Sequence, residues 1–564
     1  MNKKRYTVTA ALLYANGPVH IGHIAGAYLP ADIYVRYLKR KGHDVAFICG
    51  SDEHGAAITL KAKKENLQPV EIINKYHDIN KKAFKDFGIN FSIYDRTSSK
   101  SHHKTAQDFF KLLNDKKVFS KEISKQFYDT KNKQFLADRY ISGECPKCND
   151  KNAYGDQCEK CGSALSPNEL INPKSSISGE TPIKKETLHW YLPMQKHESW
   201  LKKWIEYGIL NKETLHNPKL WRNQVIGQCK SWIDNGLKSR AMTRDLDWGV
   251  KVPIKNTEGK VLYVWLDAPI AYISATKKWA KKNNKKWEDY WKDSKTELVH
   301  FIGKDNIVFH CIIFPILLKE HGGYILPKNV PANEFLNLEG KKLSTSKNWA
   351  IWLHEYLTDF IGHEDALRYA LCATAPETKD TDFTWKEFQA RNNNELVSIF
   401  GNFINRVVVL THKYWNGIVP NTNTLSTYDN EILKKIEKFP KKIGSSIEQF
   451  RFREGLAELI NLARIGNKYL AENEPWKLWK IDKQRTETIM NIAIQISGLL
   501  TILSEPFLPF TSKKMEHLLD FYNTEWDNAK IPIIKNGHQI NKPVHVFKRI
   551  EDEKIDIVIK KLKL

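Results

Sequence analysis

The amino-acid sequence predicts an α/β protein with a doubly wound parallel sheet that is split by an insertion and followed by an all-helical region. Three observations lead to this prediction. Apolar runs typical of buried strands alternate with helical patterns over most of the first 335 residues. Two pairs of cysteines interrupt this alternation within residues 116–234. After about residue 390 the strand signals vanish, and long helical patterns follow at 396–414, 429–466 and 486–503.

The first strand and helix form the most informative element. Residues 6–14 are apolar and β-branched, which predicts a buried strand, and the Asn-Gly-Pro turn at 16–18 ends it. His20 and His23 then open a helical pattern that continues to residue 38, so both imidazoles lie on one face of its first turn. Because a helix N-terminus attracts phosphate and Gly22 permits close approach, this turn suits a nucleotide site. Histidines at this spacing also occur as ordinary core or solvated residues.

Three more strand-like runs end in glycine or polar residues: 44–49, 260–265 and 298–302. In parallel sheets ligands bind beyond the carboxyl ends of the strands. Asp52, Asp267 and Asp305 fall at those ends, together with His20. The sequence therefore predicts one crevice assembled from both halves of the sheet.

Composition narrows the class of protein. The 88 basic and 65 acidic residues give a net charge of +23, which attracts polyanions such as nucleic acid, although a general bias toward lysine produces the same balance. Four of the eight cysteines are scattered singly, which indicates a reducing cytosol and no disulfide scaffold. The apolar segment 492–503 contains polar residues and is expected to be a core helix, so no membrane association is predicted.

The interrupting cysteines form a predicted metal site. Cys145, Cys148, Cys158 and Cys161 give two C-x2-C pairs separated by nine residues. Two thiolate pairs at this spacing are typical of tetrahedral Zn²⁺. Because all four positions are cysteine, no position is left open for substrate, and we expect one structural Zn²⁺. A zinc-ribbon DNA-binding protein shares this motif, but it leaves the split nucleotide fold unexplained.

The His20-Ile-Gly-His23 sequence after a strand and a turn resembles the "HIGH" signature of class I aminoacyl-tRNA synthetases. Further blocks at 10–17, 49–55, 263–272 and 301–305, with the zinc knuckle between the halves, resemble the methionyl-tRNA synthetase family over nearly the whole chain. The resemblance implies a Rossmann-like first half at 1–115, a connective insertion at 116–234, the second half at 235–335, a loop and linker region at 336–390, and a helical-bundle anticodon-binding domain at 391–564.

The resemblance also implies roles for individual residues. Asp52 is expected to bind the α-ammonium group of methionine, and the side-chain pocket is expected to consist of Leu12, Tyr14, Trp265, Pro269, Tyr272, Phe309 and His310. Binding of ATP with Mg²⁺ is assigned to His20, His23, Gly303, Asp305, Lys341, Lys342 and Lys347. The catalytic set is His20, His23, Arg244, Lys342, Ser344, Ser346 and Lys347.

Two positions depart from the family pattern. The segment 340–347 resembles the "KMSKS" loop, but Thr345 stands where the family has its second lysine, and the sequence does not choose which of Lys341, Lys342 or Lys347 replaces it. Ser175 and Ser178 stand at C-x2-C spacing where some relatives carry a second knuckle. Hydroxyl groups are poor Zn²⁺ ligands, so we expect a single zinc.

In the helical region the resemblance assigns anticodon reading to Asn402, Arg406 and Trp476, although a capping Asn and a core Trp are common alternatives. The expected function is activation of L-methionine with ATP and its transfer to tRNA(Met) for translation initiation and elongation, in the cytoplasm. The chain stops after the helical domain, without the OB-fold module that dimerises some relatives, so a monomer is predicted. A class I synthetase for another amino acid and a non-catalytic tRNA-binding protein are the competing hypotheses.

Overall fold

A computed structural model describes residues 3–136, 140–155, 158, 160–161, 165–345, 348–522 and 525–563. Within these residues the central sheet contains six strands, all parallel. Strand β1 (Arg5–Ala10) lies in the middle, with β3 (Asp44–Asp52) on one side and β16 (Thr296–Gly303) on the other. The remaining strands are β2 (Leu13–Tyr14), β4 (Ile93–Arg96) and β17 (Ala332–Asn333). The predicted parallel α/β fold is confirmed.

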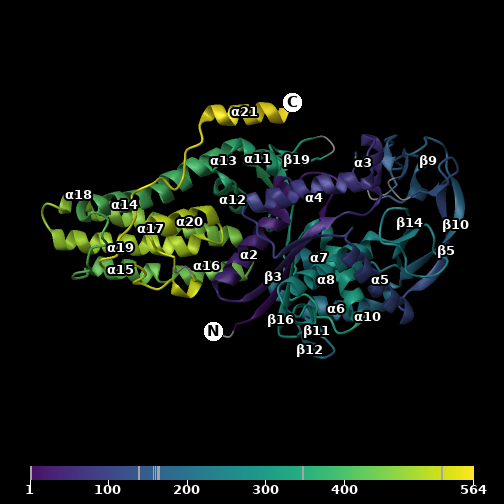
Figure 1. The fold of residues 1–564 in the computed structure, drawn as a ribbon, viewed down its shortest axis with the longest axis horizontal. Helices are drawn as coiled ribbons and strands as arrows, with labels where there is room; N and C mark the ends of the chain where they lie inside the picture. The colour runs from purple at the N-terminus through teal and green to yellow at the C-terminus, as the bar shows by residue number, and fades with distance from the viewer. Residues whose placement is uncertain are drawn as a thin grey trace.

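Helices flank this sheet and follow its strands (Figure 1). The helical segment after the first turn comprises α1 (Ile21–His23), a π-helical turn (Ile24–Tyr28) and α2 (Leu29–Arg40), as the sequence predicts. Further helices around the parallel sheet are α3 (Ala56–Glu65), α4 (Pro69–Asp86), α5 (Lys100–Asp115), α8 (Val264–Lys282), α9 (Glu288–Trp291) and α10 (Phe314–His321).

The predicted strand at 260–265 is wrong in both length and position. Strand β15 covers only Lys260–Leu262 and pairs antiparallel with β14 (Thr243–Asp245), outside the parallel sheet. Helix α8 begins at Val264, so Asp267 lies in its first turn. A short apolar run suits a buried helix start as well as a strand, and here the run continues into the core as a helix.

The insertion consists mainly of antiparallel strands. Strands β5 (Ser120–Asp129) and β10 (Ile183–Leu192) form a long ribbon, flanked by β6 (Gln134–Phe135) and β13 (Arg240–Ala241). A smaller sheet contains β7 (Ile141–Glu144), β8 (Ala153–Tyr154) and β9 (Ile171–Ser175). Short strands β11 (Ile209–Leu210) and β12 (Glu213–Thr214) pair with each other. Helices α6 (Glu198–Tyr207) and α7 (Asn223–Asp234) bury Trp204 and Val225 in one hydrophobic core with α8 and α10.

A small mixed sheet lies between the region of the parallel sheet and the all-helical region of the chain. Strand β18 (Leu336–Leu338) pairs antiparallel with β19 (Lys341–Lys342) and parallel with β20 (Thr381–Phe383). Around it lie α11 (Leu353–Asp359), α12 (Glu364–Ala373) and α13 (Trp385–Arg391). The β18–β19 hairpin, which carries Lys341 and Lys342, therefore follows the parallel sheet in the chain.

After a π-helical segment (Asn392–Gly401), the predicted all-helical region contains α14 (Asn402–Trp415), α15 (Thr427–Ile436), α16 (Phe439–Glu448), α17 (Phe452–Asn473), α18 (Pro475–Leu478), α19 (Lys483–Ser504), α20 (Pro509–Leu518) and α21 (Asp552–Lys563). The pattern at 429–466 is therefore three helices and not one. A break precedes α16, which has Pro440 in its first turn, and Phe450 adopts φ 58° between α16 and α17. Among the described residues, α19 alone is long and apolar enough to cross a membrane, but 94% of its apolar window is buried in the bundle.

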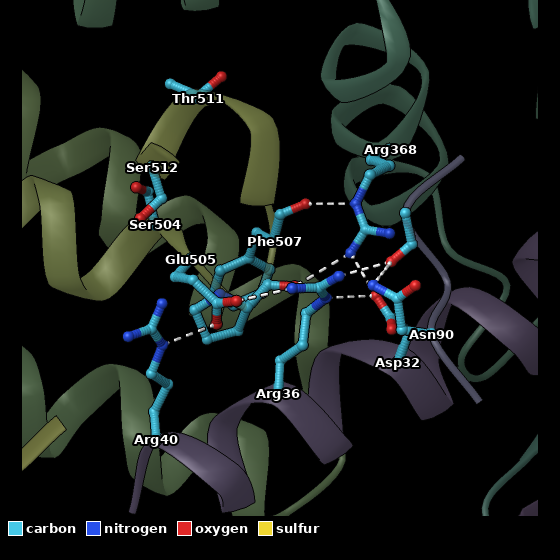
Figure 2. A network of polar contacts seen from close by, with 12 residues as sticks. Asp32, Arg36, Arg40, Asn90, Arg368, Ser504, Glu505, Phe507, Thr511 and Ser512 are labelled. Carbon is cyan, nitrogen blue, oxygen red and sulfur yellow. Dashed lines mark hydrogen bonds and ion pairs between the residues drawn. The ribbon is translucent and has the colours of Figure 1, made fainter. Parts of the chain in front are cut away.

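Buried ion pairs connect the helical bundle to α2, the helix that packs beside the parallel sheet (Figure 2). Arg368 of α12 has no exposed side-chain surface and donates to Asp32 Oδ2 over 2.7 Å and to the Phe507 carbonyl over 2.9 Å. Arg36 donates to the same Asp32 oxygen over 2.7 Å and to Glu505 Oε1 over 2.6 Å. Because Asp32 and Arg36 both lie on α2, the helix that follows the two histidines is fixed directly to the bundle.

Candidate active site

His20 and His23 hold each other at the start of α1. The backbone N–H groups of Gly22 and His23 donate to His20 Nδ1 over 3.1 and 3.4 Å, and the His20 N–H donates to His23 Nδ1 over 3.3 Å. The two rings stack with centroids 3.7 Å apart. Burial lowers the pKa of His23 to about 4 and the pKa of His20 well below its ordinary value, so both are neutral at pH 7. Each ring accepts through Nδ1, so each presents a proton on Nε2 to a ligand.

The lysine hairpin and the loop after it lie against this turn. A Cβ on Gly22 would lie 2.5 Å from Leu343 Cδ1, which shows how closely the loop approaches the histidines. Lys341 and Lys342 are exposed, with their ammonium groups 5.0 Å from the Trp349 ring and 5.3 Å from the Phe335 ring. Ser344 exchanges backbone hydrogen bonds of 3.0 and 2.9 Å with Trp349. The predicted residues Ser346 and Lys347 lie outside the described part of the chain.

Asp52 ends strand β3 at the rim of a cavity of about 490 Å³. Burial, and next the charge of Asp267, raise the pKa of Asp52 to about 7. A bound ammonium group would favour its ionised form. Arg244 lines the same cavity with its guanidinium 4.1 Å from the centre of the Tyr263 ring. Other lining residues are Tyr14, Asn16, His54, Gly55, Trp248 and Phe309.

Aromatic side chains from α8 and the segment after β16 lie beside this cavity. Tyr272 and His310 are buried, and Tyr272 Oη lies 3.0 Å from His310 Nε2. His310 Nδ1 lies 3.0 Å from the Asn306 carbonyl, so the neutral ring donates there and accepts the Tyr272 hydroxyl proton at Nε2. Burial lowers the pKa of His310 to about 4, which keeps it neutral. The Trp265 and Phe309 rings meet edge to face with centroids 4.3 Å apart.

Two more predicted pocket residues are Pro269, on α8, and Leu12, between β1 and β2. Pro269 is buried within α8, and Leu12 is half-buried against the core that contains Tyr272. Asp305 is exposed in the turn after β16. Its Oδ1 is only 2.7 Å from where a Cβ of Gly303 would lie, so a larger residue at 303 would displace the carboxylate.

The four cysteines of the predicted metal site come together in the insertion. All four sulfur atoms lie within 4.8 Å of one another. The Sγ atoms of Cys145 and Cys161 are 3.8 Å apart, and those of Cys148 and Cys158 are 3.5 Å apart. Tetrahedral Zn²⁺ with bonds of about 2.3 Å requires sulfur separations of about 3.8 Å. The cluster therefore fits a zinc ion.

The three predicted anticodon residues lie on α14 and α18. Asn402 and Arg406 are one turn apart on α14. The Arg406 guanidinium lies 4.8 Å from the centre of the Trp476 ring. A second cavity, of about 280 Å³, opens beside the exposed Asn402. The arrangement presents an amide, a cation and an aromatic face within one region of the bundle.

The family described as tRNA synthetases class I (M) matches residues 6–408, and the anticodon binding domain of methionyl tRNA ligase matches residues 419–563. The chain belongs to the methionyl-tRNA synthetase family. It is 58% identical over 569 residues to the methionine--tRNA ligase of Christiangramia forsetii and 59% identical over 564 residues to that of Flavobacterium psychrophilum. In both cases 100% of this chain and 81% of the relative are covered.

A solved structure of the Mycobacterium tuberculosis methionyl-tRNA synthetase in complex with methionyl-adenylate has a TM-score of 0.80 against this chain. The match covers 97% of this chain and 100% of that one at 21% sequence identity. At this identity the likeness establishes the shared fold. It is consistent with the split sheet, the insertion and the helical bundle described above.

In this synthetase fold Ser175 and Ser178, which stand at C-x2-C spacing, belong to a hydrogen-bonded cluster around Asp129. Ser175 Oγ donates to Asp129 Oδ2 over 2.6 Å, and the Asn132 backbone N–H donates to Asp129 Oδ1 over 3.0 Å. Hydrogen bonds from Ser175, Ser178 and Asn132 outweigh burial and hold the pKa of Asp129 well below its usual range. A carboxylate thus connects the residues around Ser175 and Ser178.

Sequence reasoning missed two histidines behind Asp52. His54 and His102 both contact Asp267, which is fully buried. Proximity to Asp52 in the sequence was a usable signal for His54. Nothing in the pattern around His102 indicated that α5 reaches the same carboxylate, because that contact spans 165 residues.

Proposed function

We propose that this methionyl-tRNA synthetase chain activates L-methionine with ATP and transfers it to the 3′-terminal adenosine of tRNA(Met). The observation that supports this most strongly is the position of Asp52. It ends β3 and lines the cavity of about 490 Å³ together with Tyr14, Trp248 and Phe309. A carboxylate beside an aromatic, neutral pocket suits an α-ammonium group attached to a polarizable thioether.

In the proposed first step, a carboxylate oxygen of methionine attacks the α-phosphorus of ATP. A new P–O bond forms, the bond to the β-phosphate bridging oxygen breaks, and pyrophosphate leaves. This chemistry needs positioning and charge stabilisation, with no covalent enzyme intermediate. The Nε2–H groups of His20 and His23 donate to phosphate oxygens, while Arg244, Lys341 and Lys342 supply positive charge. Asp305 and Gly303 receive the ribose, and Mg²⁺ accompanies ATP.

In the proposed second step, the 2′-hydroxyl of the terminal adenosine attacks the methionyl carbonyl and AMP leaves. Asn402, Arg406 and Trp476 read the anticodon by base-edge hydrogen bonds and stacking. One structural Zn²⁺ bound by the four cysteines stabilises the insertion. We also propose that the protein is cytoplasmic and monomeric. Light scattering measures its mass in solution and tests the monomeric state.

The test of the function is amino-acid-dependent ATP–pyrophosphate exchange, run with Mg²⁺ across the standard amino acids. Exchange with methionine alone is the expected result, and it would also show that Thr345 is compatible with activation. Exchange with a different amino acid would refute the substrate assignment. No exchange with any amino acid, in a folded sample containing zinc, would favour a non-catalytic tRNA-binding protein.

A further inference from the structure

A buried carboxylate with two histidine partners lies directly behind the amino-acid site. Asp267 has no exposed surface, and its Oδ2 lies 2.5 Å from His54 Nδ1. Its other oxygen, Oδ1, contacts His102 Nε2. His102 in turn has its Nδ1 2.9 Å from Ser274 Oγ, and this hydroxyl donates to the Ala271 carbonyl over 3.1 Å. Within the described chain, these side chains form a continuous polar cluster, with Glu53 and His103 close to His54.

Burial of the Asp267 carboxylate is unfavourable in free energy, whereas burial of an apolar side chain at the same place would be favourable. A fully buried ionised carboxylate loses its favourable hydration, and this loss is offset only by well-placed partners. Here burial opposes ionisation, yet the charges and hydrogen bonds of His54 and His102 hold the pKa of Asp267 well below its usual range. Asp267 likewise raises the pKa of His54 against the effect of burial. The negative charge is therefore fixed in place.

The three residues come from three different elements. His54 follows Asp52 by two residues at the end of β3, and its backbone N–H lies 3.5 Å from Asp52 Oδ1. Asp267 lies in the first turn of α8, two residues after Trp265 and five before Tyr272. His102 lies on α5, which packs along α8. The cluster thus links the strand that carries the proposed ammonium anchor to the helix that carries the proposed side-chain wall.

We propose that Asp267, held between His54 and His102, is a positioning residue of the amino-acid site. It fixes the start of α8 against the end of β3, so that Asp52 and the aromatic wall face each other at the separation that methionine requires. Asp267 acts through these residues and does not touch the reacting atoms. The inference rests on the proposed function and adds the basis of its amino-acid affinity.

The test compares Asp267→Ala and Asp267→Asn with the wild-type protein in methionine-dependent pyrophosphate exchange. We expect Asp267→Ala to raise KM for methionine by at least about tenfold, because a displacement of about 1 Å at a binding site has effects of this size or larger. KM for ATP should stay within about twofold, since the histidine pair lies on another element. Asparagine keeps hydrogen-bonding atoms at both positions and should recover most of the affinity.

A buried carboxylate elsewhere supplies the matched control. Asp429 of α15 is also fully buried and is bound by Tyr469 and Arg485 in the helical bundle. Asp429→Ala should lower the melting temperature as Asp267→Ala does, but leave KM for methionine unchanged. If Asp267→Ala does not fold, His102→Ala removes one partner only and should raise KM for methionine by a smaller factor.

The outcomes separate the two proposals. A wild-type protein without methionine-dependent exchange refutes the proposed function itself. If the wild-type protein is active and folded Asp267→Ala has an unchanged KM for methionine, or raises both KM values equally, the positioning role is refuted. The same holds if Asp429→Ala raises KM for methionine as much as Asp267→Ala, since the effect would then be general destabilisation.

Discussion

Gly22 lies between the two histidines and offers a direct test of how closely the lysine loop and the histidine turn must fit. In Gly22→Ala the new Cβ would lie 2.5 Å from Leu343 Cδ1 and 3.1 Å from two ring atoms of His20. Ordinary carbon contacts are about 3.5–4.0 Å, so the Leu343 methyl group must move by at least about 1 Å and the His20 ring by a few tenths of an ångström. Gly26→Ala, one turn further along, is the matched control, because nothing lies within 4 Å of its Cβ position.

A displacement of about 1 Å at a reacting centre costs about 10²-fold in rate, so a shift of a few tenths of an ångström in the His20 ring is expected to cost about tenfold, which is about 1.4 kcal/mol. We therefore expect Gly22→Ala to lower kcat/KM for ATP by about tenfold in methionine-dependent pyrophosphate exchange, with Gly26→Ala within about twofold of wild type. Adding Leu343→Ala should recover part of the loss, since it removes the shorter of the two contacts. A Gly22→Ala enzyme within threefold of wild type would refute the reasoning, because the loop would then move aside at no cost.

The other predictions concern the ammonium anchor, the metal site, the domain junction and the anticodon region. Burial and a neighbouring carboxylate raise the pKa of Asp52 to about 7, so Asp52 is protonated below pH 7. KM for methionine should therefore rise about tenfold per pH unit below that value, as measured by pyrophosphate exchange from pH 5.5 to 8.5. Cys148→Ser should reduce bound zinc from one ion per chain toward none, measured by atomic absorption. Arg368→Met removes one of the two arginine donors to Asp32 and the Arg368 hydrogen bonds to three carbonyl groups, and it should lower the free energy of unfolding in urea by about 3–5 kcal/mol; a change below 1 kcal/mol would contradict the role of this junction. Trp476→Ala should leave pyrophosphate exchange unchanged and lower kcat/KM for tRNA by at least about tenfold; equal losses in both assays would contradict a role in tRNA recognition.

Much of the fold was accessible from local patterns. The predicted strands at 44–49 and 298–302 are mostly apolar runs followed by glycine and polar residues, which is typical of buried parallel strands, and they form most of β3 and β16. The apolar run at 260–265 has the same appearance but leads into α8 at Val264. Periodicity cannot separate a short buried strand from a buried helix start, because both place every residue in the core.

The candidate site was accessible where its residues are adjacent in sequence or match a family motif. The spacing of His20 and His23 correctly predicts that the rings lie together, and the cysteine spacing correctly predicts one cluster. The contact between His102 and Asp267 joins residues 165 positions apart and follows from how α5 packs on α8. Such contacts depend on tertiary packing, which a single sequence does not encode in any local pattern. The assigned roles of the site residues stay predictions until they are measured.

The distribution of charge differs between the two ends of the crevice, one beside His20 and His23 and the other beside Asp52. Two imidazolium rings at the 3.7 Å separation of His20 and His23 would repel each other by about 4 kcal/mol even at an effective dielectric constant of 20. Burial keeps both rings neutral, so they can stack and still present two N–H donors. Positive charge near this turn comes instead from Lys341 and Lys342, which are exposed on a hairpin and lose little hydration when no phosphate is bound. At the other end Asp52 and Asp267 are carboxylates withdrawn from water, with the Arg244 guanidinium lining the same cavity as Asp52, and burial of the carboxylates favours the binding of a compensating cation. In the proposed site, we expect the neutral donors and exposed cations at one end and the carboxylates at the other to orient a zwitterionic amino acid relative to a polyphosphate before any reaction takes place.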